Sequence, residues 1–288
     1  MSITADVSCV WKVGAILGES PCWDRRQDAL VWVDIKGHRL HAFGIEDRRT
    51  RTWAPPTRIC SLGVPPSSWT PPPVDAHWFL GCTENGFGWI GAAAGEVIEH
   101  PLAHPEPDKP GNRFNDGKMG PDGRYWAGTM DDAEINATGS LYAFQETGAF
   151  ERIDTGYVVS NGPAFSPDRR TLYHTDSARR VIYAFDLSAA GAVTNRRIFV
   201  EFSDRDGYPD GMTTDRAGNL WVAMWDGARI EKLSPGGERL GHISMPVTRP
   251  TSCAFANAEE SVLYVTSAAI GAQADDALAG GLFRVDLR

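Results

Sequence analysis

The stretch GRYWAGTM, Gly123–Met130, places one tryptophan in a short run of strand-forming residues directly after a polar turn. Similar runs occur on both sides of it, each with a tryptophan or tyrosine in the same setting. They centre on Trp32, Trp78, Trp126, Tyr173, Trp221 and Tyr264, with successive spacings of 46, 48, 47, 48 and 43 residues. A fixed period of about 40–50 residues is typical of β-propeller blades.

Each period also reads as a unit of several short strands. A polar turn such as SPDRRT precedes the aromatic run, and a second strand-like run such as RVIYAFDL follows it. The apolar residues lack the 3.6-residue period of helices, and the alternative β-sandwich would show no fixed long period. The sequence therefore predicts an all-β, six-bladed β-propeller in which residues 1–288 form a single domain. The proline-rich stretch Val64–Val74 is expected to be a rigid loop within the second unit.

The composition argues against several classes of binding partner. The net charge of −9 over 288 residues argues against a nucleic-acid surface, which requires a basic stripe. No apolar run reaches the length of a membrane span, and the first residues do not resemble a secretory leader. Five scattered cysteines fit reduced thiols better than a disulfide framework. We therefore expect a cytoplasmic protein, monomeric or weakly oligomeric, that binds neither nucleic acid nor membranes.

Four polar phrases precede the repeat aromatics at nearly the same distance. LGESPCWD, RFNDGK, SNGP and YPDG place one polar residue each 13, 11, 12 and 11 residues before the aromatic of their unit, namely Glu19, Asn115, Asn161 and Asp210. Positions in the same phase of different blades lie at the same height around one central axis. We therefore expect these side chains to meet at one mouth of the central channel.

The last unit repeats this phase, so we expect Ser252 or Thr251 on the same rim. Two carboxylates and two amides buried together would be costly without a cation. Glu, Asn and Asp oxygens suit Ca²⁺, Mg²⁺ or Mn²⁺ and are less typical of Zn²⁺. A solvated polar channel without metal is the alternative.

Two further residues of these segments have a structural interpretation. Lys118 is expected to be solvated and paired with Asp116 or another acid. His174, in an aromatic run, is expected to be a hydrogen-bonded structural histidine.

Taken together, the polar phrases and their surroundings resemble the SMP-30/gluconolactonase family of six-bladed propellers, which includes regucalcin-like proteins and bacterial sugar lactonases. The matching segments span five blades in the family's order: Leu17–Asp24, Arg113–Met130, Ser160–Asp168, Tyr173–Asp186 and Tyr208–Met212. The resemblance implies one divalent cation at the top of the central channel. Its ligands would be Glu19, Asn161 and Asp210.

The resemblance also implies the residues that bind substrate. Arg113 and Asn115 would bind the hydroxyls of a sugar lactone. In regucalcin-like proteins a glutamate of the loop after AGTM also binds substrate, and the shorter loop here offers Asp131, Asp132 and Glu134. We choose Glu134 for this role. The second unit's segment Arg58–Val74 departs from the family pattern, so the resemblance does not specify its part of the wall.

The implied activity is hydrolysis of aldonolactones, such as glucono-, xylono- or arabinono-lactone, to the aldonic acids. The enzyme would be a metal-dependent lactonase, a carboxylic ester hydrolase, with Ca²⁺ favoured by ligand type and Zn²⁺, Mg²⁺, Mn²⁺ or Fe²⁺ as alternatives. Asp210 would act as a ligand and as the general base. No GxSxG motif supports a serine hydrolase. The alternatives are another metal-dependent esterase or phosphotriesterase on this scaffold, and a non-catalytic calcium-binding propeller.

Overall fold

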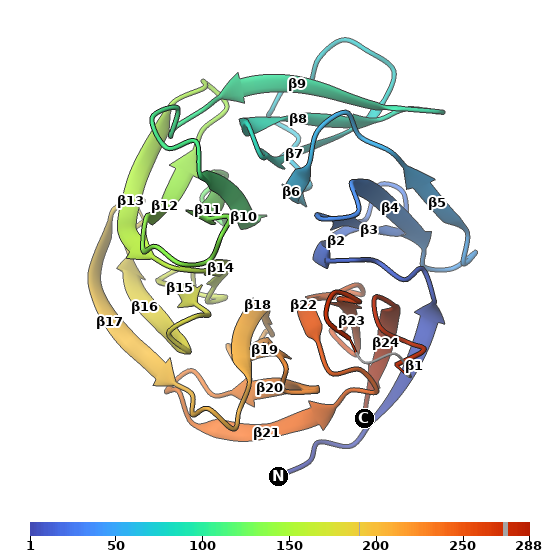
Figure 1. Ribbon diagram of the computed structural model, residues 1–288, viewed down its shortest axis with the longest axis vertical. Helices are drawn as coiled ribbons and strands as arrows, with labels where there is room; N and C mark the ends of the chain where they lie inside the picture. Colours follow the sequence, from blue (N-terminus) through green and yellow to red (C-terminus); the bar gives the residue numbers. More distant parts are fainter. Residues whose placement is uncertain (190, 273–275) are drawn as a thin grey trace.

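The computed structural model describes residues 1–189, 191–272 and 276–288. These residues form 24 strands in six four-stranded antiparallel sheets, arranged radially around a central axis (Figure 1). The prediction of an all-β, six-bladed propeller is confirmed. Within the described residues no helix is long and apolar enough to cross a membrane.

Five blades consist of four consecutive strands, in order from the axis outward. They are blade 1 (β2 Gly18–Asp24, β3 Ala29–Asp34, β4 Arg39–Gly44, β5 Thr50–Trp53), blade 2 (β6 Ile59–Gly63, β7 His77–Thr83, β8 Gly86–Ala92, β9 Val97–Ala103), blade 3 (β10 Asn112–Met119, β11 Tyr125–Asp131, β12 Gly139–Phe144, β13 Phe150–Tyr157), blade 4 (β14 Ser160–Phe165, β15 Thr171–Asp176, β16 Val181–Leu187, β17 Val193–Glu201) and blade 5 (β18 Tyr208–Thr214, β19 Leu220–Trp225, β20 Arg229–Leu233, β21 Arg239–Ser244).

Blade 6 joins the two ends of the chain. Its inner strands β22 (Pro250–Phe255), β23 (Val262–Ser267) and β24 (Leu282–Leu287) are completed by β1 (Ala5–Trp11) as the outermost strand. The register pairs Ala5 with Leu287 and Cys9 with Phe283. Figure 1 shows β1 lying beside β24. This closure, which the repeat spacing alone did not predict, ties the ring together by backbone hydrogen bonds.

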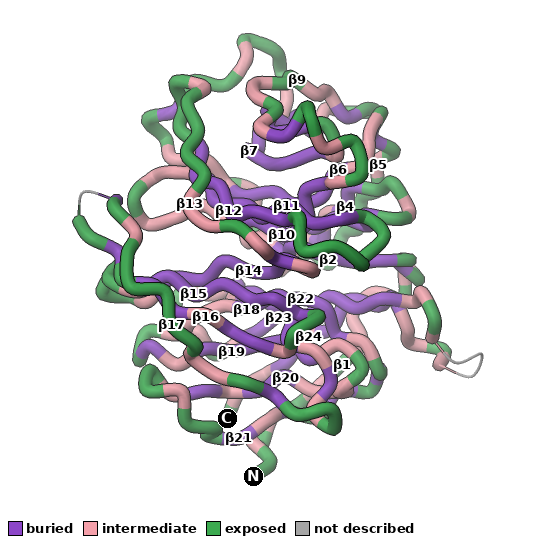
Figure 2. Tube along the Cα trace, turned by 60° about the vertical axis from the view of Figure 1, so that its left-hand side comes forward, coloured by how far each residue is buried: buried purple, intermediate pink, exposed green. Residues whose placement is uncertain are grey.

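The repeat aromatics occupy equivalent places in the blades. All six lie on the second strand and are almost completely buried, because these strands pack between neighbouring sheets. Outer strands such as β13, β17 and β21 carry many exposed residues, whereas buried residues dominate the inner strands (Figure 2). The period in the sequence therefore reflects burial of one large ring per blade.

The proline-rich stretch forms a loop between β6 and β7, as predicted. Its Trp69 is buried and packs edge-on against Trp89 of β8, with ring centroids 6.0 Å apart. The loop is thus anchored to its own blade by an aromatic contact.

Candidate functional site

Every inner strand contains an irregularity in its pairing with the second strand. The register shifts after Glu19 in β2, after Phe114 in β10, after Asn161 in β14 and after Pro209 in β18, with counterparts in β6 and β22. A bulge bends a strand and redirects a side chain out of the regular alternation. The polar phrases of the sequence therefore mark the places where the inner strands bend beside the axis.

The bulged strands β2, β10, β14 and β18 line a cavity of about 630 Å³ at the end of the channel where the inner strands begin. All six residues predicted from the sequence line it: Glu19, Arg113, Asn115, Glu134, Asn161 and Asp210. The remaining wall is mixed, with apolar residues such as Leu17 and Met130 and cations such as Lys36 and Arg249. The structure thus brings together side chains from four blades and one loop.

The two amides form a hydrogen-bonded chain across blades 3 and 4. Asn115 Nδ2 donates to Asn161 Oδ1 at 2.9 Å, and Asn161 Nδ2 donates to Ser177 Oγ at 2.9 Å. Ser177 Oγ in turn donates to the Pro209 carbonyl at 2.6 Å. Asn161 is therefore held with its oxygen toward Asn115, and a carbonyl oxygen retains a second lone pair for another partner.

The two carboxylates are buried without adequate partners. Asp210 Oδ1 accepts no hydrogen bond from any described residue. Burial and the neighbouring charge of Asp116 raise the pKa of Asp210 well above its usual range. Burial, followed by the charges of Asp210 and Asp116, does the same to the pKa of Glu19. Like charges in a dehydrated site repel, so this arrangement favours a bound cation.

These residues fit a hard divalent cation. Carboxylate and amide oxygens are the ligands that Ca²⁺ and Mg²⁺ prefer. Among the described residues no three His, Cys, Asp or Glu side chains are arranged to hold a metal. An ion at this cavity would therefore use the amide oxygen of Asn161 beside Glu19 and Asp210, which is the predicted ligand set.

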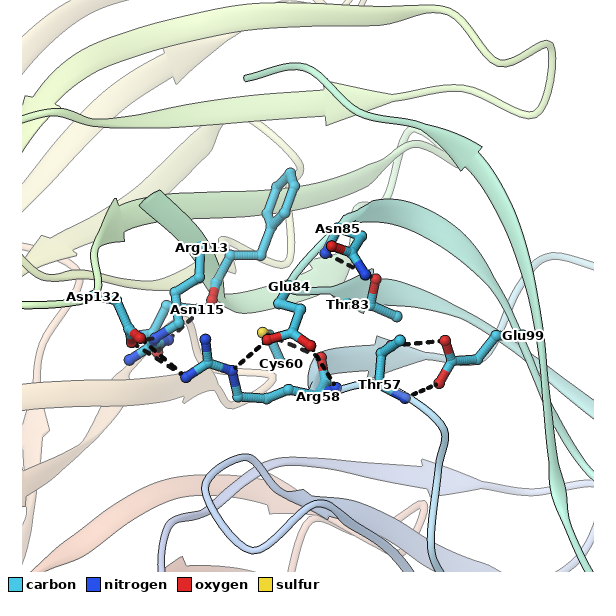
Figure 3. Close-up of polar contacts among 11 residues, drawn as sticks. Thr57, Arg58, Cys60, Thr83, Glu84, Asn85, Glu99, Arg113, Asn115 and Asp132 are labelled. Atoms are coloured by element: carbon cyan, nitrogen blue, oxygen red, sulfur yellow. Dashed lines mark hydrogen bonds and ion pairs between the residues drawn. The ribbon is translucent and has the colours of Figure 1, made fainter. Parts of the chain in front are cut away.

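Arg113 is buried and firmly held. Its Nε donates to Asp132 Oδ1 at 2.5 Å, and its Nη1 donates to Asn115 Oδ1 at 2.7 Å and to the Phe114 carbonyl at 2.9 Å (Figure 3). Its Nη2 makes no hydrogen bond with a described residue, so it is free to donate to a ligand.

The three acids after β11 have different positions. Glu134 is exposed, has a positive φ of 60° and lines the cavity, as chosen from the sequence. Asp132 instead pairs with Arg113. Asp131 accepts hydrogen bonds from the backbone and side chain of Asn136 and so stabilises the loop.

One acid close enough to influence Glu19 and Asp210 was not predicted from the sequence, although it does not itself line this cavity. Asp116 accepts hydrogen bonds from the backbone N–H groups of Gly117, at 2.8 Å, and Gly162, at 3.1 Å. Burial raises its pKa to about 6. Its position directly after Asn115 was the available signal, but the Asn-Asp-Gly sequence reads first as a turn.

The family model described as SMP-30/Gluconolactonase/LRE-like region matches residues 17–269. The chain belongs to this family. The resemblance inferred from the sequence is therefore confirmed.

Relatives within the SMP-30/gluconolactonase family cover nearly the whole chain. A 6-deoxy-6-sulfogluconolactonase of Pseudomonas putida is 33% identical over 262 residues, 91% of this chain and 86% of that protein. Regucalcin of Gallus gallus is 32% identical over 294 residues, covering 97% of this chain and 93% of that protein. A solved structure of regucalcin from Agrobacterium tumefaciens, described as a calcium-binding protein, matches with a TM-score of 0.89 and 25% identity, covering 100% of this chain and 97% of that one. These relatives support the predictions of a lactonase-type hydrolase and of a divalent cation.

In this SMP-30/gluconolactonase family member the expectation for the last blade, that Ser252 or Thr251 lies on the same rim as the other polar residues, is wrong. Ser252 lies on a second cavity of about 360 Å³, at the opposite end of the inner strands. Thr251 is buried and donates to the Gly18 carbonyl. The bulge in β22 comes before Ser252 rather than after it, so the Ser252 side chain is directed away from the 630 Å³ cavity.

Of the two residues with a structural interpretation, Lys118 differs from expectation and His174 does not. Lys118 does not form an ion pair with a described acid; its Nζ donates to the Met212 carbonyl at 2.7 Å. His174 is a buried structural histidine, as expected, and its Nε2 lies 2.9 Å from Ser160 Oγ.

Proposed function

We propose that this protein is a divalent-metal-dependent lactonase that hydrolyses aldonolactones, such as glucono-, xylono- or arabinono-lactone, to aldonic acids. The observation that carries the proposal is the partnerless carboxylate oxygen of Asp210, buried beside Glu19 and Asn161 in a cavity that Arg113 also lines. The sulfogluconolactonase among the relatives supports the substrate class. Calcium is the ion we favour, since the ligands are oxygens and a related regucalcin is described as calcium-binding.

Each residue of the cavity would have a role that follows from its position. Glu19, Asn161 and Asp210 would hold the cation, which when bound supplies Lewis-acid polarisation of the lactone carbonyl. Arg113 would donate from its free Nη2 to sugar oxygens, and Asn115, fixed by Asn161 and Arg113, would orient a neighbouring hydroxyl. The exposed Glu134 would contact the substrate from the rim of the cavity.

Asp210 is also our candidate for the general base. Hydrolysis forms a bond between the water oxygen and the carbonyl carbon, breaks the bond to the ring oxygen, and yields a carboxylic acid and a hydroxyl. Asp210 would accept the proton that the attacking water loses, and that proton would then be available to the departing ring oxygen. General acid–base assistance of this kind typically contributes about 10²–10⁴ in rate.

The proposal is tested with metal-stripped protein, a panel of aldonolactones, and single cations restored one at a time. We expect turnover only after a divalent cation is restored. Asp210→Ala should lose at least about 10²-fold in kcat and also lose cation binding by calorimetry. Asp186→Ala is the matched control, because Asp186 pairs with Arg197 on the outer part of blade 4.

Two results would contradict the proposal. Turnover that survives complete removal of metal would exclude the metal-dependent chemistry. Cation binding without hydrolysis of any lactone would favour the non-catalytic calcium-binding alternative.

A further inference from the structure

Blade 2 is linked to Arg113, which lines the cavity, through a chain of charged side chains (Figure 3). Arg58, the residue directly before β6, receives its orientation from Glu84: its Nε donates to Glu84 Oε2 at 3.2 Å. Its Nη1 lies 3.1 Å from Asp132 Oδ2 and 3.3 Å from Asp132 Oδ1, across the boundary between blades 2 and 3. Asp132 then accepts from Arg113 Nε, so one carboxylate joins two arginines.

Asp132 is held by this second arginine as well as by Arg113. It belongs to the loop between β11 and β12, and its side chain is 41% exposed, whereas that of Arg58 is only 18% exposed. Partial burial of Asp132 opposes its ionisation, but the hydrogen bond from Arg113 and the charges of Arg113 and Arg58 lower its pKa. The carboxylate is therefore ionised at neutral pH and fixed from the side of blade 2.

The consequence for the cavity follows from how Arg113 is held. With Nε on Asp132 and Nη1 on Asn115, the planar guanidinium has one orientation, which leaves Nη2 as its free donor. Asn115 Oδ1 depends on the same guanidinium, and Asn115 Nδ2 contacts Asn161. A displaced Asp132 would therefore disturb both predicted substrate-binding residues.

We propose that Arg58 is a positioning residue for lactone binding: it fixes Asp132, which in turn orients the Arg113 fork toward the substrate. The inference rests on the proposed lactonase function and extends it to a blade that does not itself line the cavity. It assigns a role to the start of the Arg58–Val74 segment, the part of the chain that departs from the family pattern.

The test compares Arg58→Ala, Arg58→Lys and Asp132→Asn in steady-state kinetics with saturating cation. We expect Arg58→Ala to raise KM by about tenfold, a loss of about 1.4 kcal/mol of binding, with a much smaller change in kcat. Arg58→Lys should recover part of the loss, since it restores a cation beside Asp132. Cation affinity, measured by calorimetry, should be unchanged in Arg58→Ala.

The matched control is Arg229→Ala. Arg229 is also 18% exposed and also pairs with two acids, Asp206 and Glu231, but neither acid pairs with a residue of the cavity. Its loss should lower the melting temperature without raising KM. A purely structural role for Arg58 would give the same pattern as this control and would overturn the inference.

A double-mutant cycle makes the test specific. In the Asp132→Asn background, Arg58→Ala should add little to KM, because the path to Arg113 is already broken. Full additivity of the two changes, or an unchanged KM in Arg58→Ala, overturns the inference while wild-type turnover leaves the proposed function standing. Absence of turnover in the wild-type protein overturns the proposed function itself, and this inference with it.

Discussion

At the scale of single residues, the site is built at the expense of stability. Asp210 and Glu19 are buried near Asp116. Burial and the charge of Asp116 raise the pKa of both, and the charge of Asp210 raises that of Glu19 further. A fold optimised only for stability would place apolar or paired residues here. The sequence thus places unpaired buried charges where the cation is expected. Departures of this kind from the rules of core packing are typical of functional sites.

Asp210→Asn should therefore make the metal-free protein more stable. The amide keeps the shape of the side chain but removes a buried charge, which should raise the free energy of unfolding by about 1–3 kcal/mol. The same variant should lose the stabilisation that wild-type protein gains from added Ca²⁺. Urea titrations with and without cation measure both effects. A metal-free variant less stable than the metal-free wild type would contradict this view of the site.

A buried histidine away from the site makes stability depend on pH. His41 stacks on Trp32 with centroids 4.3 Å apart, its Nδ1 lies 2.9 Å from Thr52 Oγ1, and burial lowers its pKa to about 4. Since the unfolded chain binds this proton at about pH 6.5, the stabilisation is complete above that pH and is lost as the pH falls toward 4.

His41→Gln should flatten this pH dependence. Between pH 7 and pH 4 the wild type should lose up to about 3 kcal/mol more than the variant, since one pKa unit is about 1.4 kcal/mol. Urea unfolding at several pH values gives the two slopes. Identical slopes would show that His41 does not titrate with unfolding.

At the scale of elements, the second strand of blade 3 approaches the first strand of blade 4 so closely that a side chain would collide there. A Cβ on Gly128 of β11 would lie 1.7 Å from Ser160 Oγ and 2.9 Å from Ser160 Cβ. Ser160 begins β14 and directly precedes the predicted ligand Asn161. The spacing between blades 3 and 4 is therefore coupled to the geometry of the site.

Gly128→Ala should displace the start of β14. We expect a loss of about 1–3 kcal/mol in the free energy of unfolding, typical of overpacking, together with weaker cation binding. Ser160→Gly should partly rescue both properties by removing the obstructing atoms. The control is Gly95→Ala, where the added Cβ would meet no atom within 4 Å. Equal effects of the two alanine substitutions would contradict the role of packing at Gly128.

The sequence predicted the blades and the residues around the cavity better than the contacts between blades. The buried aromatics gave the number of blades, and the phase of Glu19, Asn115, Asn161 and Asp210 placed them around one cavity, because both signals repeat along the chain. A contact between two residues of separate segments does not repeat along the chain, so the sequence gives no sign of it. The contact between Arg58 and Asp132 and the exact place of each bulge, which misled the assignment of Ser252, depend on the packing of neighbouring blades.

At the scale of the whole molecule, stability depends on the sheet that joins the two ends of the chain. Circular permutation tests this without changing composition. Opening the chain in the exposed turn at Ala94–Gly95 moves the joint from blade 6 to blade 2, where β8 and β9 would then pair across the new termini. Opening it at Asp204–Arg205, between blades 4 and 5, leaves no blade that contains both termini.

The first permutant should match the natural protein, and the second should be less stable by about 2–4 kcal/mol, the amount by which a covalent cross-link typically stabilises a fold. Urea unfolding of both proteins, each with the same linker between Arg288 and Met1, provides the comparison. Equal stabilities would show that closure through a shared sheet contributes nothing beyond the contacts between blades.

The sheet shared by the two ends of the chain also determines when, during translation, the ring can close. Blades 1 to 5 are each encoded by a continuous segment, so each has all of its strands once that segment leaves the ribosome. The strand β1 is made first yet finds its neighbour β24 only when translation is almost finished (Figure 1). Until then the circle has a gap between β18 and β2, where β22 belongs, and the cavity has no complete wall. A nascent or prematurely terminated chain would thus be unable to enclose a ligand, however well its first five blades had formed.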